Sequence, residues 1–577
     1  MTGPPATTSA LRRRVWRLGL FALALGLVAT LLGPVPRARA DTSQVTILED
    51  DPLVLAQPEA TLTEARALGV GVLRLRLPWA AVAPDTRSWT APRFKAADPA
   101  AYGSAAWAPY DAVIVAAQGL GIRVDLDLSG GAPRWATGPD QPRKAKGYPH
   151  WQWEPNAADF GAFVRAVGAR YSGDWNPVTD RRDPGNPADL PRVSFWSVWN
   201  EPNYGPSLAP QGLPGHPGVE DSPRMYRMLV DAAWSGLART GHRVPGDTIL
   251  VGELAPRSQL TPPGAFRDFN GMTPMVFLEA LYCLDSSFHP LRGTAATLRG
   301  CPATAAGSRR FVSAHPGLFA NSGIADHPYD EWWPPNVEED RPALRGWALE
   351  NGQDTSLATI GVLTRGLDRL MAAYHVQRRL PVWDTEYGYQ TSPPHRVWRG
   401  DPRPWPSPST AALWDNWAEY LHWKNPRIRS FAQYLLRDPA RPVATNDFGS
   451  FPSGLQNFNG TPKADLGAFR MPLFLPRTRT SEPHAALQVW GDVRPAGPGL
   501  GLVAGPPFVT LWFRPLGSSR FSRLTALTLG AEGYYDAWVR FSASGTLEAR
   551  WSGSSDVLAN ALGGLSLTSR MVAVTVR

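Results

Sequence analysis

Two glutamates, Glu201 and Glu386, each follow directly on an apolar, aromatic-rich run of the sequence. Glu201 lies in SVWNEPN and Glu386 in WDTEYGY. Taken alone, Asn-Glu-Pro is also an ordinary turn, but a carboxylate just past a buried strand is an unusual place for a solvated charge. Two carboxyl groups on either side of a bond, one protonated and one ionised, can cleave a glycosidic linkage. Because the two are far apart in sequence, only a fold can bring them together.

Eight apolar, β-branched runs recur along the chain, with helix-like segments between them. The runs are Val45–Glu49, Val70–Leu77, Ile122–Leu128, Val193–Trp199, Thr248–Gly252, Gly323–His327, Pro381–Thr385 and Arg429–Leu435. The clearest helix-like segments are Ala60–Leu68, Asp159–Tyr171, Met225–Thr240 and Ser356–Arg379. This alternation predicts an α/β fold, a (β/α)8 TIM barrel in which the two glutamates end the fourth and seventh strands. Periodicity alone leaves a doubly wound parallel sheet open.

The pattern of apolar residues changes near Pro476, and beyond it no apolar residues recur at helical spacing. Strand-like runs alternate there with turn signals, in LQVWGDV, FVTLWFRP, YYDAWVRFS, TLEARWSG and MVAVTVR. This pattern predicts a small antiparallel β-sandwich of the immunoglobulin or fibronectin kind. We therefore expect a signal peptide over 1–40, a barrel over 41–480 and the β-sandwich over 481–577.

The N-terminal segment has the pattern of an export signal. Four arginines, at positions 12, 13, 14 and 17, precede the apolar run Leu18–Leu32 and the small-residue site Ala38-Arg39-Ala40. The alternative is a membrane anchor, although the run is short for a span, which needs about 20 residues. We expect cleavage after Ala40 and a secreted, extracellular protein, either released or held at the cell surface. Membrane contact would come only through this segment if it stayed uncleaved.

Most of the positive charge belongs to that segment. The first forty residues hold six arginines and no acid, so their removal lowers the formal net charge from +8 to +2. The mature chain also has no run of five or more Lys and Arg residues, so we expect no nucleic-acid partner.

The only cysteines are Cys283 and Cys301. In an oxidising compartment they are expected to form a disulfide, the alternative being two free thiols. Two cysteines and scattered histidines cannot make a Cys-rich zinc site, and there is no His-Glu-x-x-His pattern. No dinucleotide-binding or Walker-type loop follows a strand, and we expect neither cofactor nor metal.

Four segments in the order expected for barrel strands two, four, six and seven carry a family resemblance. They are RLRLPWAAVAP, FWSVWNEPNYG, IADHPYD and PVWDTEYGYQT. Together they resemble clan A glycoside hydrolases, with families 39 and 5 the most similar, over about residues 45–480. The resemblance implies an O-glycosyl hydrolase that acts on an oligosaccharide or polysaccharide by double displacement with retention. Glu201 would be the acid/base and Glu386 the nucleophile.

The resemblance also implies roles for neighbouring residues. Asn200 would bind the sugar 2-hydroxyl, Arg74 and Tyr329 would orient Glu386, and His327 would line the floor of the site. Arg76 competes with Arg74 for that role. Asp127 would either contact sugar or pair with an arginine inside the barrel. Three tryptophans at strand ends are candidates for substrate contact, with core packing as the alternative: Trp79, Trp135 and Trp199.

One segment departs from the family 5 pattern. That family carries a histidine at the end of strand three, where this chain reads LDLSGGAPRWA. Two other functions remain open at this stage. One is a non-catalytic carbohydrate-binding or cell-wall-associated protein on a barrel scaffold. The other is a transglycosylase, which shares the catalytic residues and differs in water access.

Overall fold

The structure is a computed structural model, and it describes most of the chain after the N-terminal segment. The described residues are 44–139, 141, 150–257, 268–337, 353–394, 403, 405–439, 451–482, 485–496, 507–530, 532–553 and 566–577. The expected signal peptide over 1–40 lies outside them, as do parts of the long inserts. No helix among these residues combines the length and apolar character needed to cross a bilayer.

Eight parallel strands form one sheet in the order β10-β1-β2-β3-β6-β7-β8-β9. They are β1 (Val45–Glu49), β2 (Val72–Arg76), β3 (Arg123–Leu128), β6 (Phe195–Val198), β7 (Thr248–Leu254), β8 (Gly323–Asp326), β9 (Val382–Asp384) and β10 (Ser430–Tyr434). A parallel bridge between Val382 and Ile428 returns β9 to the start of β10. The predicted TIM barrel is therefore confirmed. The doubly wound alternative is wrong because β10 lies between β9 and β1 and so closes the sheet into a barrel.

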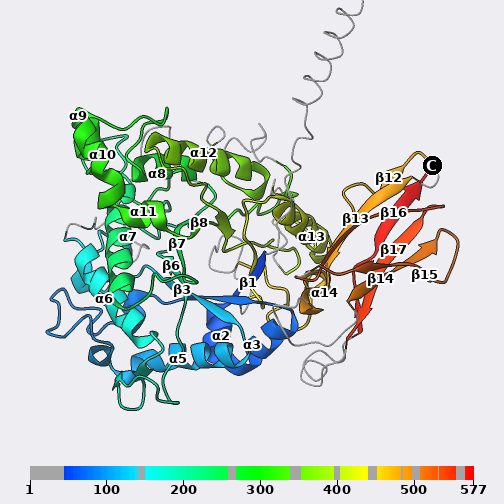
Figure 1. The fold of residues 1–577 in the computed structure, drawn as a ribbon, viewed down its shortest axis with the longest axis horizontal. Coiled ribbons are helices and arrows are strands. Elements are labelled where there is room, and N and C mark those ends of the chain that lie inside the picture. The colour runs from blue at the N-terminus through cyan, green and yellow to red at the C-terminus, as the bar shows by residue number, and fades with distance from the viewer. Residues whose placement is uncertain are drawn as a thin grey trace, which may run out of the picture. The chain divides into compact units, whose positions relative to one another are not determined.

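Helices lie around the outside of these strands (Figure 1). They are α2 (Asp51–Ala56), α3 (Pro58–Ala67), α4 (Trp79–Val82), α5 (Ser104–Gly119), α6 (Ala157–Arg170), α7 (Ser222–Arg239), α8 (Pro274–Leu281), α9 (Gly293–Leu298), α10 (Ala305–Ala314), α11 (Pro316–Ala320), α12 (Ile360–Ala373), α13 (Pro408–Lys424) and α14 (Ala464–Arg470). The helix predicted over Ser356–Arg379 is shorter because His375 adopts φ 57°, a left-handed conformation that ends a helix.

The region beyond the barrel is all β, as predicted. Its strands are β11 (Leu473–Phe474), β12 (Arg479–Thr480), β13 (Ala486–Asp492), β14 (Phe508–Pro515), β15 (Ser522–Thr528), β16 (Tyr534–Arg540), β17 (Gly545–Ser552), β18 (Ser566–Thr568) and β19 (Val572–Val576). They form one sheet with the order β11-β13-β16 and another with the order β12-β19-β17-β14-β15, in which β18 also pairs with β17. Their apolar residues form a core of their own. The sequence missed β15 because this strand is polar and half-exposed.

Charged residues at every second position distinguish the early barrel strands. β2 reads Val-Leu-Arg-Leu-Arg and β3 reads Arg-Val-Asp-Leu-Asp-Leu. Successive side chains of a strand face opposite sides, and in a barrel one of these sides is the interior. Arg74 therefore shares the interior with Asp125 and Asp127, all of them fully buried.

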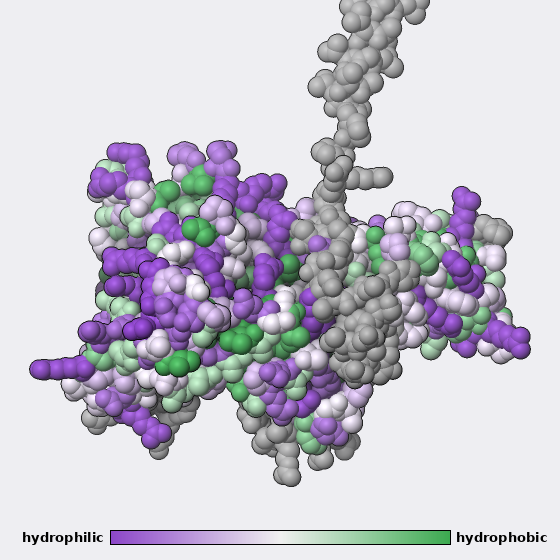
Figure 2. Space-filling view, turned by 60° about the horizontal axis from the view of Figure 1, so that its bottom comes forward, coloured by the Kyte–Doolittle hydropathy of each residue, from purple (hydrophilic) through white to green (hydrophobic). Residues whose placement is uncertain are grey.

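On the face of the molecule shown in Figure 2, hydrophilic residues predominate and hydrophobic residues form small patches between them.

Candidate active site

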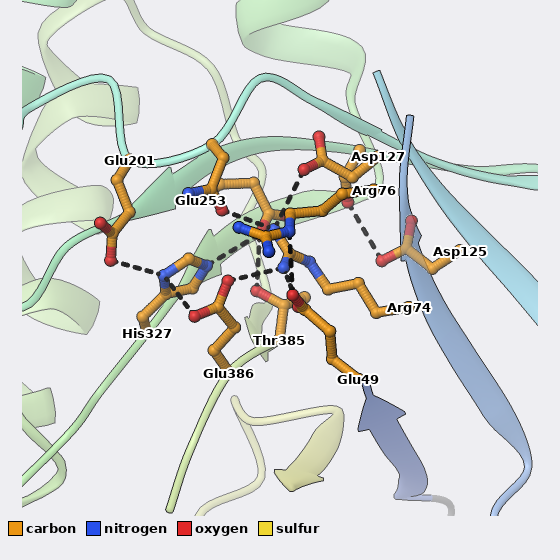
Figure 3. Close-up of polar contacts among 12 residues, drawn as sticks. Glu49, Arg74, Arg76, Asp125, Asp127, Glu201, Glu253, His327, Thr385 and Glu386 are labelled. Atoms are coloured by element: carbon orange, nitrogen blue, oxygen red, sulfur yellow. Dashed lines mark hydrogen bonds and ion pairs between the residues drawn. The ribbon is translucent and has the colours of Figure 1, made fainter. Parts of the chain in front are cut away.

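Glu201 and Glu386 meet at the carboxyl ends of the barrel strands. Glu201 lies three residues past β6, and Glu386 lies two residues past β9. Both side chains point toward His327 (Figure 3). One oxygen of each carboxylate and Nδ1 of His327 all lie within 4.8 Å of one another. The nearest oxygens of the two carboxylates thus lie within 4.8 Å of each other, which suits the roughly 5–5.5 Å between carboxyl groups in double-displacement chemistry.

His327 lies at the end of β8 and bridges three carboxylates. Its Nδ1 is 3.0 Å from Glu201 Oε1 and 3.6 Å from Glu386 Oε2, and its Nε2 is 3.0 Å from Glu253 Oε2. Burial alone would lower the pKa of His327, but Glu386, Glu201 and Glu253 together raise that pKa well above its usual value. The raised pKa favours the imidazolium form of His327, in which Nδ1–H faces Glu201 and Nε2–H faces Glu253.

Arg74 occupies the centre of the barrel and is completely buried. It donates to Glu386 at 2.6 Å, to Asn200 Oδ1 at 2.8 Å and to Glu253 at 2.9 Å, and it also pairs with Glu49. Arg76, which the sequence left as a competitor, instead pairs with Asp51 at 2.8 Å and Glu49 at 3.0 Å. It is thus Arg74 that contacts Glu386.

Tyr329 gives Glu386 a second donor. Its hydroxyl donates to Glu386 Oε2 at 3.1 Å, while Arg74 donates to Oε1. Each oxygen of Glu386 therefore has its own donor. The side chain of Glu386 is 8% exposed, and that of Glu201 is 20% exposed. Glu386 is the more enclosed of the two, and Glu201 is the more accessible from solvent.

Asp127 pairs with Arg74 at 3.3 Å and is fully buried, so of the two roles left open it takes the ion pair inside the barrel. Burial raises the pKa of Asp127, Asp125 and Glu49, against the opposing effect of Arg74. These acids hold protons more readily than free carboxyl groups do. Protonation relieves the repulsion that so many carboxylates around one arginine would otherwise produce.

Two of the three tryptophans proposed for substrate contact lie in the core instead. Trp79 and Trp199 are completely buried. Trp79 stacks on Phe163, and Trp199 meets Phe160 edge to face. Both phenylalanines belong to α6, which covers the outside of the strands, so the two rings pack against that helix, in agreement with the core-packing alternative.

Trp135 is partly buried. Its ring meets Trp79 edge to face at 5.7 Å, and its indole N–H donates to the carbonyl of Pro84. Its visible contacts are therefore packing contacts too.

The sequence interpretation did not single out Glu253, Glu49, Asp125 or Thr385, all of which belong to the buried network. The sequence could have indicated Glu253, because this glutamate comes directly after the apolar run Thr248–Gly252, much as Glu201 follows the run Val193–Trp199. The Arg-Leu-Arg and Asp-Leu-Asp alternation marked Asp125.

Three residues in or beside this site also have unusual backbone conformations. Trp199, Glu201 and Glu253 have φ angles of 65°, 45° and 48°, in the left-handed region that non-glycine residues rarely adopt. The backbone N–H of Glu201 donates to the carbonyl of Glu253 at 2.8 Å. Such conformations persist where surrounding contacts enforce them, and they cluster at functional sites.

Among the described residues, one group of acids and histidine converges closely enough to suggest a cation, namely Glu201, His327 and Glu386. Their atoms are already engaged by Arg74, Tyr329 and the His327 ring itself. Hydrogen bonds and ion pairs thus satisfy the group, and we assign no metal to it.

Cys283 and Cys301 form a disulfide in the segment between β7 and β8, around α8 and α9. The bridge ties the end of α8 to the end of α9 within one loop of the barrel.

Comparisons with known proteins find similarity only at the level of structure. No model of a known family matches the chain, and no curated protein does. One similar structure is a family 39 glycoside hydrolase from the gut symbiont Bacteroides cellulosilyticus WH2, at 13% identity over 87% of this chain and 80% of that one, with a TM-score of 0.43.

Two further structures are a glucosidase from Croceicoccus marinus and an endo-beta-1,4-mannanase from Thermotoga petrophila. The first is 12% identical over 94% of this chain and 95% of that one, with a TM-score of 0.42. The second is 11% identical over 92% and 98%, with a TM-score of 0.37. These neighbours are glycosidases, the group that the sequence motifs resemble. Similarity this distant carries no argument about activity, which must rest on the site itself.

Proposed function

We propose that this protein is a retaining glycoside hydrolase that cleaves O-glycosidic bonds of an oligosaccharide or polysaccharide. One observation carries the proposal. Glu201 and Glu386 face each other within 4.8 Å, and the more enclosed Glu386 receives hydrogen bonds from Arg74 and Tyr329. Donors on both oxygens suit a carboxylate that must stay ionised and aimed at a carbon atom. The more accessible Glu201 suits the proton donor.

The proposed reaction has two steps. Glu386 attacks the anomeric carbon while Glu201 gives its proton to the leaving oxygen, which breaks the glycosidic bond and forms a glycosyl-enzyme ester. Because His327 donates to Oε1 of Glu201, the transferred proton would be carried on Oε2. Glu201 then removes a proton from water, the resulting oxygen attacks the anomeric carbon, and Glu386 leaves. Two inversions give net retention.

Asn200 would hold the sugar 2-hydroxyl in this scheme. Its Oδ1 accepts from Arg74, which fixes the orientation of the amide and directs its NH2 group away from the arginine. A contact to the 2-hydroxyl strengthens as the transition state forms.

The test is hydrolysis of a panel of aryl glycosides and polysaccharides, followed by proton NMR of the product released from the accepted substrate. We expect the first product to keep the anomeric configuration of the substrate. Inverted product would contradict the proposal. Glu386→Ala should lose the activity on every accepted substrate, and unaltered activity would rule out Glu386 as the nucleophile. A wild-type protein that hydrolyses nothing but still binds polysaccharide would favour the non-catalytic alternative.

We also propose that the protein is exported and cleaved after Ala40. The basic segment, the apolar run and the small-residue site support this, as does the Cys283–Cys301 disulfide, which suits an oxidising compartment. The mass of protein recovered from the culture medium tests it. A species that begins at Asp41 is expected, whereas full-length protein in the membrane fraction would indicate an anchor.

A further inference from the structure

Glu253 contacts both cations of the buried network, Arg74 and His327, although it does not face the gap between the two glutamates (Figure 3). It lies near the end of β7 and is fully buried. Its Oε2 accepts from Arg74 Nη2 at 2.9 Å, from His327 Nε2 at 3.0 Å and from Thr385 Oγ1 at 2.9 Å. Its backbone carbonyl accepts from the N–H of Glu201. One residue therefore contacts the supports of both catalytic glutamates.

We propose that Glu253 is a positioning residue that holds His327 as an imidazolium between Glu201 and Glu386. The inference rests on the proposed function, because it gives His327 its task in that reaction. With Nε2–H directed at Glu253, the opposite ring nitrogen must point at Glu201 and Glu386. The ring then has one orientation and one charge state, and it sets the position of the acid/base relative to the nucleophile.

The backbone of β7 is distorted where it presents Glu253. The pairing register between β7 and β8 shifts between Val251 and Leu254. Gly252 adopts φ 121°, and a Cβ there would lie 2.6 Å from the carbonyl oxygen of Ala325. A shift of this kind re-aims a side chain and is common beside active sites. In a regular strand, Gly252 and Glu253 would not adopt these angles, so the distortion accompanies the inward orientation of the carboxylate.

The alternative is that Glu253 serves only as a counter-ion for Arg74. Arg74 already pairs with Glu49, Glu386 and Asp127, so it does not lack negative partners. Among the described residues, by contrast, Glu253 is the carboxylate that faces His327 Nε2. Burial would raise the pKa of Glu253, but Arg74 and His327 lower it to about 2. Glu253 is thus a permanent anion against the ring, whereas its buried neighbours Asp125 and Asp127 hold protons more readily.

The experiment measures the charge of His327 directly. Histidine labelled with 13C at Cε1 gives one resonance per ring, and the His327 signal is identified by its absence in His327→Gln. In Glu253→Gln we expect the deprotonation midpoint of His327 to fall by about 1 pH unit or more, because one facing anion is removed. The other charged or titratable groups around the ring stay in place, namely Glu201, Glu386, Arg74, Tyr329 and Asp326. An unchanged midpoint would overturn the proposal.

Activity gives a second measurement on the same variants. In Glu253→Gln, kcat/KM should fall about 10- to 100-fold, the size of the loss seen when a carboxylate that orients a metal-binding histidine is removed. The alkaline limb of its pH profile should move to lower pH. Thr385→Val removes another hydrogen bond from Oε2 without removing charge, so it should leave that limb in place. Glu253→Asp, which keeps the negative charge, should move the alkaline limb part of the way back toward its wild-type pH. It replaces Glu253→Gln if the latter fails to fold.

The two readouts separate this inference from the proposed function. The NMR titration needs no substrate. If the wild-type protein hydrolyses no glycoside but the His327 midpoint still falls in Glu253→Gln, the proposed function fails while Glu253 retains its effect on the ring. If hydrolysis is retaining but the midpoint does not move, the positioning role fails alone.

Discussion

At the scale of single residues, one arginine is shared among acids that lie on different strands. Arg74 contacts Glu386, Glu253, Asp127 and Glu49, and all of these groups are buried. Removing one partner from a buried charge network leaves charges without compensation, which costs more free energy than an exposed pair contributes. Arg74 therefore both supports the fold and orients the proposed nucleophile.

Arg74→Met should consequently lose activity and also reduce the free energy of unfolding by about 3–5 kcal/mol. Arg76→Met is the matched control. Arg76 lies two residues further along β2, and its side chain is 32% exposed. Urea unfolding and activity on one accepted glycoside compare the pair. Equal losses in both variants would contradict the central role of Arg74.

The proposed roles of Glu201 as acid/base and Glu386 as nucleophile give a second prediction at this scale. Glu201→Ala should lower kcat by about 10²–10⁴-fold, the usual contribution of a general acid/base. Added azide should restore turnover and yield a glycosyl azide of retained configuration, because a small anion can enter the space of the missing carboxylate and needs no deprotonation. Glu386→Ala with azide should instead give the inverted azide. The same product from both variants would contradict the assignment.

At the scale of elements, the barrel brings Glu201, His327 and Glu386 together because each follows a parallel strand. Parallel strands that close into a barrel have all their carboxyl ends at one rim. The strand order places β7 and β8 between β6 and β9. Glu253 and His327, at the ends of these two strands, therefore lie between the two glutamates.

The segment between β7 and β8 contains the disulfide, which predicts an effect on stability. The bridged cysteines are 18 residues apart, and closing a loop of that size is worth about 3 kcal/mol in the chain-entropy model. The Cys283→Ala, Cys301→Ala double variant should melt at lower temperature than the wild type, with activity retained below the transition. Reductant should lower the melting temperature of the wild type and leave that of the variant unchanged. No effect on either would show that the bridge does not stabilise the fold.

At the scale of the whole molecule, buried carboxyl groups recur well beyond the site. Burial raises the pKa of Asp50 to about 6, of Asp330 to about 7 and of Asp465 to about 8. The folded protein therefore binds more protons than the unfolded chain between these values and the ordinary carboxyl pKa of about 4. Glu253, with its pKa lowered to about 2, acts in the opposite sense, and its contribution is lost only below the ordinary value.

The expected outcome is a protein more stable in mild acid than in mild base. Where the folded state binds more protons, stability falls as pH rises, so the free energy of unfolding should decrease from about pH 5 to about pH 8. The raised pKa of His327 adds to this decrease above its ordinary value of about 6.5, where the folded protein still holds a proton that the unfolded chain has lost. Calorimetry at constant ionic strength measures the trend.

Asp465→Asn is the control for this trend. The amide resembles the protonated acid, so the variant should gain stability at pH 8 relative to the wild type and change little at pH 5. A wild-type protein more stable at pH 8 than at pH 5 would contradict the argument.

Much of the architecture was predictable from the sequence, because its physical causes are local. Apolar runs such as Val45–Glu49 and Gly323–His327 match β1 and β8 closely, since a strand buried on both faces must be apolar almost throughout. The turn from apolar run to Asn-Glu-Pro also located Glu201 at a strand end. The motif implied that an arginine of β2 pairs with Glu386, but only the structure shows that it is Arg74 and not Arg76.

The tertiary structure alone decided which residues surround the two glutamates. Whether Trp79 and Trp199 face a sugar or a helix depends on the side of the strand layer to which each ring turns, and they turn toward α6. The position of Glu253 depends on a register shift between β7 and β8, which the spacing of apolar residues in the sequence does not predict. Sequence determines which segments are strands and which side chains can do chemistry. Contacts between strands distant in sequence determine which charges meet, because burial and pairing are properties of the assembled barrel.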